Sequence, residues 1–248
     1  MTGFGPWRLR VAASTGLGVV IEGLDGPTAA PADYVDQVLL TDAHREAFFA
    51  LIDRSGLVVC QHVGGDDATH QDVRGRSSRG RLSQGEHYHH DGCSGPDKPR
   101  VVEIRCPYQT IGRHTATAIA PFPETVHAML RELPAELRGA DSAVAAWYAV
   151  LAADGALPIG SHDAVQGAIN RIVRLAMNAE TARAYFRAVD VRADAYREPC
   201  SMGESRFIAN ACADRGRTMQ HRRAYLEAPG RPNGRLVKRW PAGPAMHE

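Results

Sequence analysis

The sequence predicts a β-rich α+β fold, in which a barrel or double-sheet roll carries a set of helices. Two observations support this prediction. Short β-branched segments lie toward both ends of the chain and enclose a middle that is mostly amphipathic helix. Strands and helices do not alternate one by one, which argues against a parallel sheet of βαβ units. We expect a single domain over residues 1–248, with a helical insertion at about residues 121–193.

Strands are predicted where β-branched or alternating apolar residues form short runs. In chain order these runs are 16–22, 57–63, 100–106, 115–119, 206–210, 218–221 and 235–240. The last three restore strand character after the helical middle. Strands at both ends of the chain therefore enclose a helical centre.

Helices are predicted where apolar residues recur at spacings of three and four. These segments are 32–54, 124–137, 143–153, 164–177 and 179–189. The first helix is expected to end at Ser55-Gly56, because glycine is typical just past a helix. The polar segment 64–84 has no periodicity, and we interpret it as a mobile loop.

Charge and cysteine content narrow the classes of partner. The 29 Lys and Arg residues nearly balance the 28 Asp and Glu residues, which argues against nucleic acid or an anionic membrane as the main partner. The five cysteines form no Cys-x-x-Cys pair, as is typical of free thiols in a reducing compartment. Neither a signal peptide nor a membrane-spanning run is evident. We expect a soluble, cytoplasmic protein that acts on a small molecule.

The candidate metal-binding residues lie between Gln84 and Cys93, a segment that contains three histidines and two carboxylates. His89 and Asp91 are two residues apart, so their side chains point to the same side if the backbone is extended. One metal ion can then bind both. A His-x-Asp pair that is completed by a distant histidine is the protein part of a non-haem iron(II) facial triad.

Three other interpretations of this segment remain. It could be a solvated loop that is rich in histidine. The doublet His90-Asp91 could belong to a metal-dependent phosphohydrolase of the HD type, although glycines on both sides make the helix of that site unfavourable. The pair His87 and His89 could belong to a cupin, but the glutamate that a cupin needs shortly afterwards is not found before Glu103.

The C-terminal part supplies a distal histidine, His221, within a His-x-Arg motif, and Arg235 begins the segment Arg-Leu-Val-Lys-Arg. With the His-x-Asp pair, this order resembles the Fe(II)/2-oxoglutarate-dependent dioxygenases, in particular the TauD and clavaminate synthase-like branch, with a layout similar to carbapenem synthase. The resemblance implies a double-stranded β-helix (jelly-roll) core with a helical insertion and flanking helices. It also implies hydroxylation, desaturation or oxidative cyclisation of a small molecule, as in secondary or amino-acid metabolism.

The resemblance also assigns roles to residues. His89, Asp91 and His221 would bind Fe(II), and Arg235 would pair with the distal carboxylate of 2-oxoglutarate, which a guanidinium matches with two parallel hydrogen bonds. Thr115 would bind the same carboxylate, with Thr117 as the next candidate, and Arg239 would lie near the co-substrate. The arginines that could hold an anionic or amino-acid-like substrate are Arg74, Arg76, Arg79, Arg81, Arg105 and Arg223.

The chain departs from the family pattern before the distal histidine. Where the family has Gly-Asp and then Asp-Asn, this chain has Gly203-Glu204 and a lone Asn210. His162 is therefore an alternative distal ligand. We favour His221, because no arginine on a strand follows His162 at the family's spacing. A non-catalytic, cupin-like barrel that binds a small ligand is the remaining alternative in function.

Overall fold

The computed structural model describes residues 8–11, 19–22, 42–60, 86–91, 99–106, 115–158, 160–197, 204–210, 218–225 and 236–240. The strands are β1 (Arg8–Val11), β2 (Val19–Glu22), β3 (Leu57–Cys60), β4 (Val101–Cys106), β5 (Thr115–Pro121), β6 (Glu204–Ala209), β7 (Met219–Tyr225) and β8 (Leu236–Trp240). The helices are α2 (Asp42–Ser55), α3 (Glu124–Glu132), α4 (Ala135–Arg138), α5 (Ser142–Ala152), α6 (His162–Ala176) and α7 (Ala179–Arg192).

The strands form two sheets. The larger sheet has the order β1-β2-β3-β6-β4-β8, and its neighbours are antiparallel except for β2 and β3. The smaller sheet pairs β5 with β7 in antiparallel fashion. Single bridges extend it on both edges, from His89 to His221 and from Tyr196 to Ile119. The prediction of a β-rich α+β fold is confirmed at the level of sheets combined with helices, and the sheets are mainly antiparallel.

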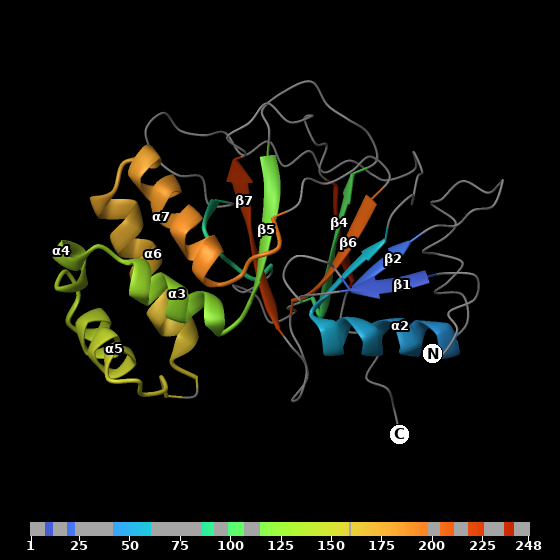
Figure 1. The fold of residues 1–248 in the computed structure, drawn as a ribbon, viewed down its shortest axis with the longest axis horizontal. Coiled ribbons are helices and arrows are strands. Elements are labelled where there is room, and N and C mark those ends of the chain that lie inside the picture. Colours follow the sequence, from blue (N-terminus) through green and yellow to red (C-terminus); the bar gives the residue numbers. More distant parts are fainter. Residues whose placement is uncertain are drawn as a thin grey trace.

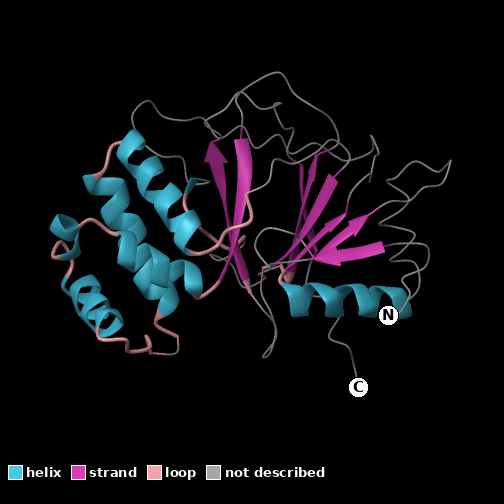
Figure 2. Cartoon of the chain, viewed as in Figure 1, coloured by secondary structure: helices cyan, strands magenta, loops and turns pink. Residues whose placement is uncertain are grey.

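The elements form layers around the smaller sheet (Figures 1 and 2). Helices α3 to α7 cover one side of β5 and β7, the larger sheet faces their other side, and α2 lies against β3 and β6. Because side chains alternate along a strand, β5 contributes to two cores. Ala118 and Ala120 pack with the helices, whereas Ile119 packs between the sheets with Val102 and Ile208.

Two details differ from the sequence prediction, and two predicted segments cannot be compared with the structure. The helix predicted over 124–137 is divided into α3 and α4, because Leu133 is extended and Pro134 cannot continue the first helix. Strand β1 was not predicted. The start of the helix predicted over 32–54 and all of the loop at 64–84 lie outside the described residues.

The turn from α2 to β3 follows the prediction. Gly56 has φ 77° and its amide donates to the Ile52 carbonyl at 2.7 Å. A glycine adopts this left-handed conformation without strain, so α2 ends there and β3 begins at once. None of the helices among the described residues is long and apolar enough to cross a membrane.

Candidate metal centre

His89 and His221 are brought together by backbone pairing. The His89 amide donates to the His221 carbonyl at 3.1 Å, and the His221 amide donates to the His89 carbonyl at 3.2 Å. Residues that exchange both bonds lie directly opposite one another, with their side chains on the same face. The two imidazole rings are accordingly 4.6 Å apart between centroids. Their relative position is therefore fixed by the smaller sheet.

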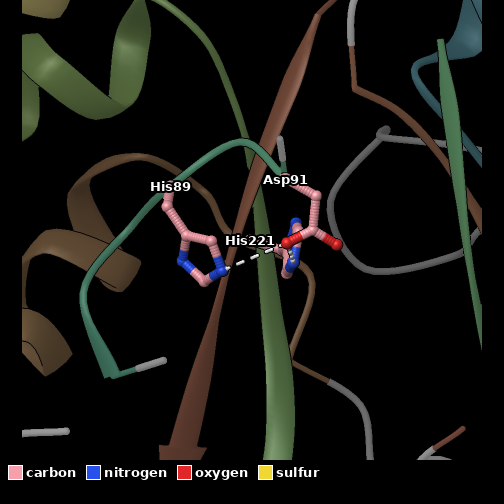
Figure 3. A group of neighbouring side chains, drawn as sticks. All are labelled: His89, Asp91 and His221. Atoms are coloured by element: carbon pink, nitrogen blue, oxygen red, sulfur yellow. Dashed lines mark ion pairs between the residues drawn. The ribbon is translucent and has the colours of Figure 1, made fainter. Parts of the chain in front are cut away.

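Asp91 completes a three-residue group that could hold a metal ion (Figure 3). Its Oδ1 lies 3.6 Å from His89 Nε2 and 3.8 Å from His221 Nε2. Neighbouring ligands of an octahedral ion lie about 3 Å apart when each metal–ligand distance is about 2.1 Å. The three donor atoms lie within 4.8 Å of one another, so a modest inward rotation of the side chains would bring them to that spacing, and the donor set fits a divalent metal.

The tautomer of His89 suits metal binding. His89 Nδ1 lies 2.8 Å from the carbonyl oxygen of His87. A carbonyl can only accept, so Nδ1 carries the proton and Nε2 keeps its lone pair on the side of Asp91. Metal-binding histidines usually have such a partner, which orients the ring and raises its basicity.

Asn210, just after β6, fixes the backbone of Asp91. The Asp91 amide donates to Asn210 Oδ1 at 2.8 Å, and Asn210 Nδ2 donates to the carbonyls of Asp91 at 2.9 Å and Pro99 at 2.8 Å. The side chain is fully buried. It thus pairs with Asp91 as a neighbouring strand would and connects the carboxylate to the larger sheet.

A buried ion pair lies behind the two histidines. Arg222 donates to Asp190 of α7 through Nε at 2.8 Å and through Nη2 at 2.5 Å, and the Tyr88 hydroxyl donates to the same carboxylate at 2.8 Å. Tyr88 precedes His89 and Arg222 follows His221, so both point to the helices while the histidines face the other way. One carboxylate of α7 therefore holds both strand segments.

Burial and charge fix the protonation of this network. Burial raises the pKa of the Tyr88 phenol well above its usual value, and the Asp190 carboxylate adds to the effect. Burial lowers the pKa of Arg222, but the interaction with Asp190 outweighs it and the net pKa is raised. The phenol thus remains a donor and the guanidinium remains charged. A buried pair whose hydrogen bonds are satisfied is compatible with a rigid site.

Further contacts hold the His89 segment against the helices. Gln166 of α6 donates to the Tyr88 carbonyl at 2.9 Å and to Gln220 Oε1 at 2.9 Å, and Gln220 returns a bond of 2.6 Å. Glu86 is buried and pairs with Arg183 of α7 at 2.9 Å. Residues 86–90 are therefore a docked segment, not the solvated loop that was an alternative interpretation.

His90 and His162, the alternatives to the favoured ligands, lie elsewhere. The His90 ring is buried and packs edge-on against Phe122, with centroids 5.1 Å apart, and its Nδ1 lies 3.4 Å from Gln220 Nε2. It therefore faces the helical layer and is not part of the candidate metal group with Asp91. His162 begins α6 and meets His127, so it is not grouped with His89 and Asp91.

The predicted cofactor and substrate residues are only partly within the described chain. Those outside the described residues are Arg235, Arg74, Arg76, Arg79 and Arg81. Those whose backbone pairing alone is described are Thr115, Arg105, Arg223 and Arg239, in β5, β4, β7 and β8. Arg223 lies opposite Thr117, which is buried, and Arg239 lies opposite Val102.

Sequence reasoning missed the residues that support the three candidate ligands. These are Tyr88, Gln166, Asp190, Asn210, Gln220 and Arg222. Two of them carried a signal, because Asn210 directly follows an apolar strand and Arg222 directly follows the distal histidine. Asp190 and Gln166 carried none, since a polar residue in a helix is ordinarily assigned to its solvated face.

No protein-family model matches the sequence, and no curated protein matches it. The chain is similar over most of its length to solved structures, three of which are as follows. One is assigned as an alpha-ketoglutarate dependent 2,4-D dioxygenase from Burkholderia xenovorans, with 14% identity, a TM-score of 0.43 and coverage of 96% of this chain and 98% of that chain. Another is AAD-2 in complex with Mn(II) and N-oxalylglycine, with 10% identity, a TM-score of 0.42 and coverage of 98% and 100%.

The third is a taurine dioxygenase from Burkholderia xenovorans, with 11% identity, a TM-score of 0.45 and coverage of 95% of this chain and 89% of that chain. Two of these three neighbours are named as dioxygenases. At such identities and scores, the chemistry has to be derived from the residues of this chain.

Proposed function

We propose that the protein is a non-haem oxygenase that uses Fe(II) and 2-oxoglutarate to oxidise a small molecule. The observation that carries the proposal is the group of His89, Asp91 and His221, whose donor atoms lie within 4.8 Å of one another. Two imidazoles and one carboxylate on one side of an ion are the ligand set of non-haem Fe(II) oxygenases, because they leave the other positions open.

The proposal gives the residues of the chain the following roles. His89, Asp91 and His221 would hold the iron, while Arg235 and Thr115 would bind the distal carboxylate of 2-oxoglutarate, with Arg239 nearby. Bound together, Fe(II), 2-oxoglutarate and dioxygen supply an oxidant that removes hydrogen from carbon, with succinate and carbon dioxide as products. The protein orients the reactants and excludes water.

The finer features of the proposal concern the fold and the substrate. We infer that the two sheets are the walls of a double-stranded β-helix within one domain. The reaction would be hydroxylation, desaturation or oxidative cyclisation, in secondary or amino-acid metabolism. Arginines are the residues that would hold an anionic or amino-acid-like substrate, and the candidates are Arg79, Arg81, Arg105 and Arg223.

The first experiment is anaerobic. Fe(II) and then 2-oxoglutarate are added to metal-free protein, and the visible spectrum is recorded. Chelation of Fe(II) by 2-oxoglutarate gives a weak charge-transfer band, which we expect in the wild type. The band should be absent in His221→Ala and weaker in Arg235→Ala. Asp163→Asn, which removes an exposed charge on α6, is the matched control and should keep the band.

The outcomes separate the candidate functions. Absence of the band in folded, iron-loaded protein would overturn the oxygenase proposal. Hydrolysis of a phosphoester by the same preparation would then favour the phosphohydrolase alternative. A folded protein that binds neither Fe(II) nor 2-oxoglutarate would favour the non-catalytic barrel, which has the fold but not the iron.

A further inference from the structure

A second pair of histidines meets on the helical layer, apart from the centre described above. His127 of α3 and His162 of α6 approach with their Nε2 atoms 3.3 Å apart. Their ring planes are tilted by 40°, and the ring centroids are 5.4 Å apart. Both side chains are half-buried, so each is reachable from solvent. The two helices pack against each other, which holds the rings in place.

The distance between the two nitrogens suits a shared metal ion. Hydrogen bonds that a nitrogen donates are most often about 2.9–3.0 Å long, so 3.3 Å is a long contact of that kind. Two imidazoles that bind one tetrahedral ion at about 2.0–2.1 Å place their nitrogens about 3.3 Å apart. The pair therefore needs little rearrangement to bind an ion in place of the hydrogen bond.

A carboxylate is available to complete the ligand set. Glu124 begins α3 and lies three residues before His127, so the two share one face of the helix. Its negative charge raises the pKa of both His127 and His162, against the larger effect of burial. Among the described residues, His89, Asp91 and His221 form the group of three whose donor atoms already converge, so Glu124 has to change its side-chain conformation to join the histidine pair. Glu124 is exposed, and its side chain can rotate toward the ring nitrogens. A Glu-x-x-His pair on one helix is also used in metal sites of helical bundles.

Burial favours the neutral form of both histidines. Burial lowers the pKa of both rings, and for His127 the neighbouring His162 lowers it further. Neutral imidazole is the form that binds metals.

We propose that His127, His162 and Glu124 form a second metal site, which takes a borderline divalent ion such as zinc and links α3 to α6. Two imidazoles and one carboxylate suit zinc, cobalt, nickel or copper better than magnesium or calcium. The site does not depend on the oxygenase chemistry. Gln166, one helical turn after His162, donates to the Tyr88 carbonyl beside His89, so an ion here would also steady the support of the first centre.

The test counts zinc ions and compares thermal unfolding. Metal-free protein is dialysed against buffered Zn²⁺, and bound zinc is measured by elemental analysis. We expect the wild type to bind two ions, because zinc can also enter the first centre. His162→Ala and His221→Ala should each bind one, and the double variant none. Zinc should raise the melting temperature of His221→Ala but not that of the double variant.

Controls keep the result interpretable. Asp163→Asn removes the exposed charge next to His162 and should still bind two ions. His127→Gln tests the site from the other helix and should lose the same ion as His162→Ala. The proposal is overturned if folded His162→Ala and His127→Gln bind as much zinc as the wild type. If His221→Ala alone abolishes all zinc binding, the second site does not exist. That result would still support the assignment of His221 as a ligand of the first centre.

Discussion

Within the part of the chain that the structure describes, histidine rings meet in two pairs that are supported in different ways. His89 and His221 lie opposite one another in a sheet, and His221 is fully buried. His127 and His162 meet across two helices at a half-exposed position. Backbone hydrogen bonds fix the first distance, whereas only side-chain packing fixes the second. The comparison indicates a tight, selective centre in the sheet and a weaker, more permissive site on the helices.

The largest expected effect is that of His221→Ala, which should impair the first metal centre and leave the second unchanged. Loss of a ligand should reduce 2-oxoglutarate turnover and Fe(II) affinity by more than about 100-fold, because even the partners of metal ligands typically contribute 10–100-fold. Zinc binding at His127 and His162 should remain, since no part of that pair lies on β7. Turnover assays and zinc analysis on one preparation measure both. Retention of normal turnover would contradict the assignment of His221.

The second prediction concerns the buried ion pair of Arg222 and Asp190, which lies behind His89 and His221. In Asp190→Asn, Arg222 loses its carboxylate partner while fully surrounded by protein, so the free energy of unfolding should fall by about 3–5 kcal/mol. Urea unfolding measures the loss. The matched control is Arg197→Ala, whose exposed guanidinium lies 3.9 Å from the same carboxylate. That variant should cost less than about 1 kcal/mol. Equal losses in the two variants would contradict the role given to the Arg222–Asp190 pair.

The sequence was sufficient to predict the three residues that meet, but not those that hold them. His89 and Asp91 could be predicted because alternation along an extended segment depends on local spacing alone. Nothing in the sequence indicated that Gln220 and Arg222, the polar residues on either side of His221, are buried. In the structure both are buried, because α6 and α7 supply polar partners for them. Such partners lie far away in sequence, and periodicity carries no information about them.

The division of the helix predicted over 124–137 has a different explanation. Pro134 was visible in the sequence, and its local effect on Leu133 outweighs the apolar spacing that continues through it. The residues expected to bind 2-oxoglutarate depend on family resemblance, and Arg235 lies outside the described residues. Arg235 and Thr115 therefore remain predictions that the anaerobic titration has to test.

The smallest expected effect is that of Asn210→Ala, which tests whether Asn210 orients the Asp91 carboxylate or only stabilises the fold. Asn210→Ala removes the side chain that pairs with the Asp91 backbone, so the free energy of unfolding should fall by about 1–3 kcal/mol. Because the carboxylate is then less well oriented, Fe(II) affinity should also fall by about 10–100-fold. Zinc binding by the helical pair should not change. Urea unfolding and metal titration measure these effects.

A second asparagine provides the control for this prediction. Asn178 caps α7 through a bond from the Thr181 amide at 2.9 Å, and α7 carries none of the four paired histidines. Asn178→Ala should cost about 0.5–2 kcal/mol, a loss similar to that of Asn210→Ala. Its Fe(II) affinity should match the wild type, because the Asp91 backbone keeps its partner. If both asparagine variants bind Fe(II) as the wild type does, Asn210 contributes only stability, and the sheet pairing alone sets the geometry of the first centre.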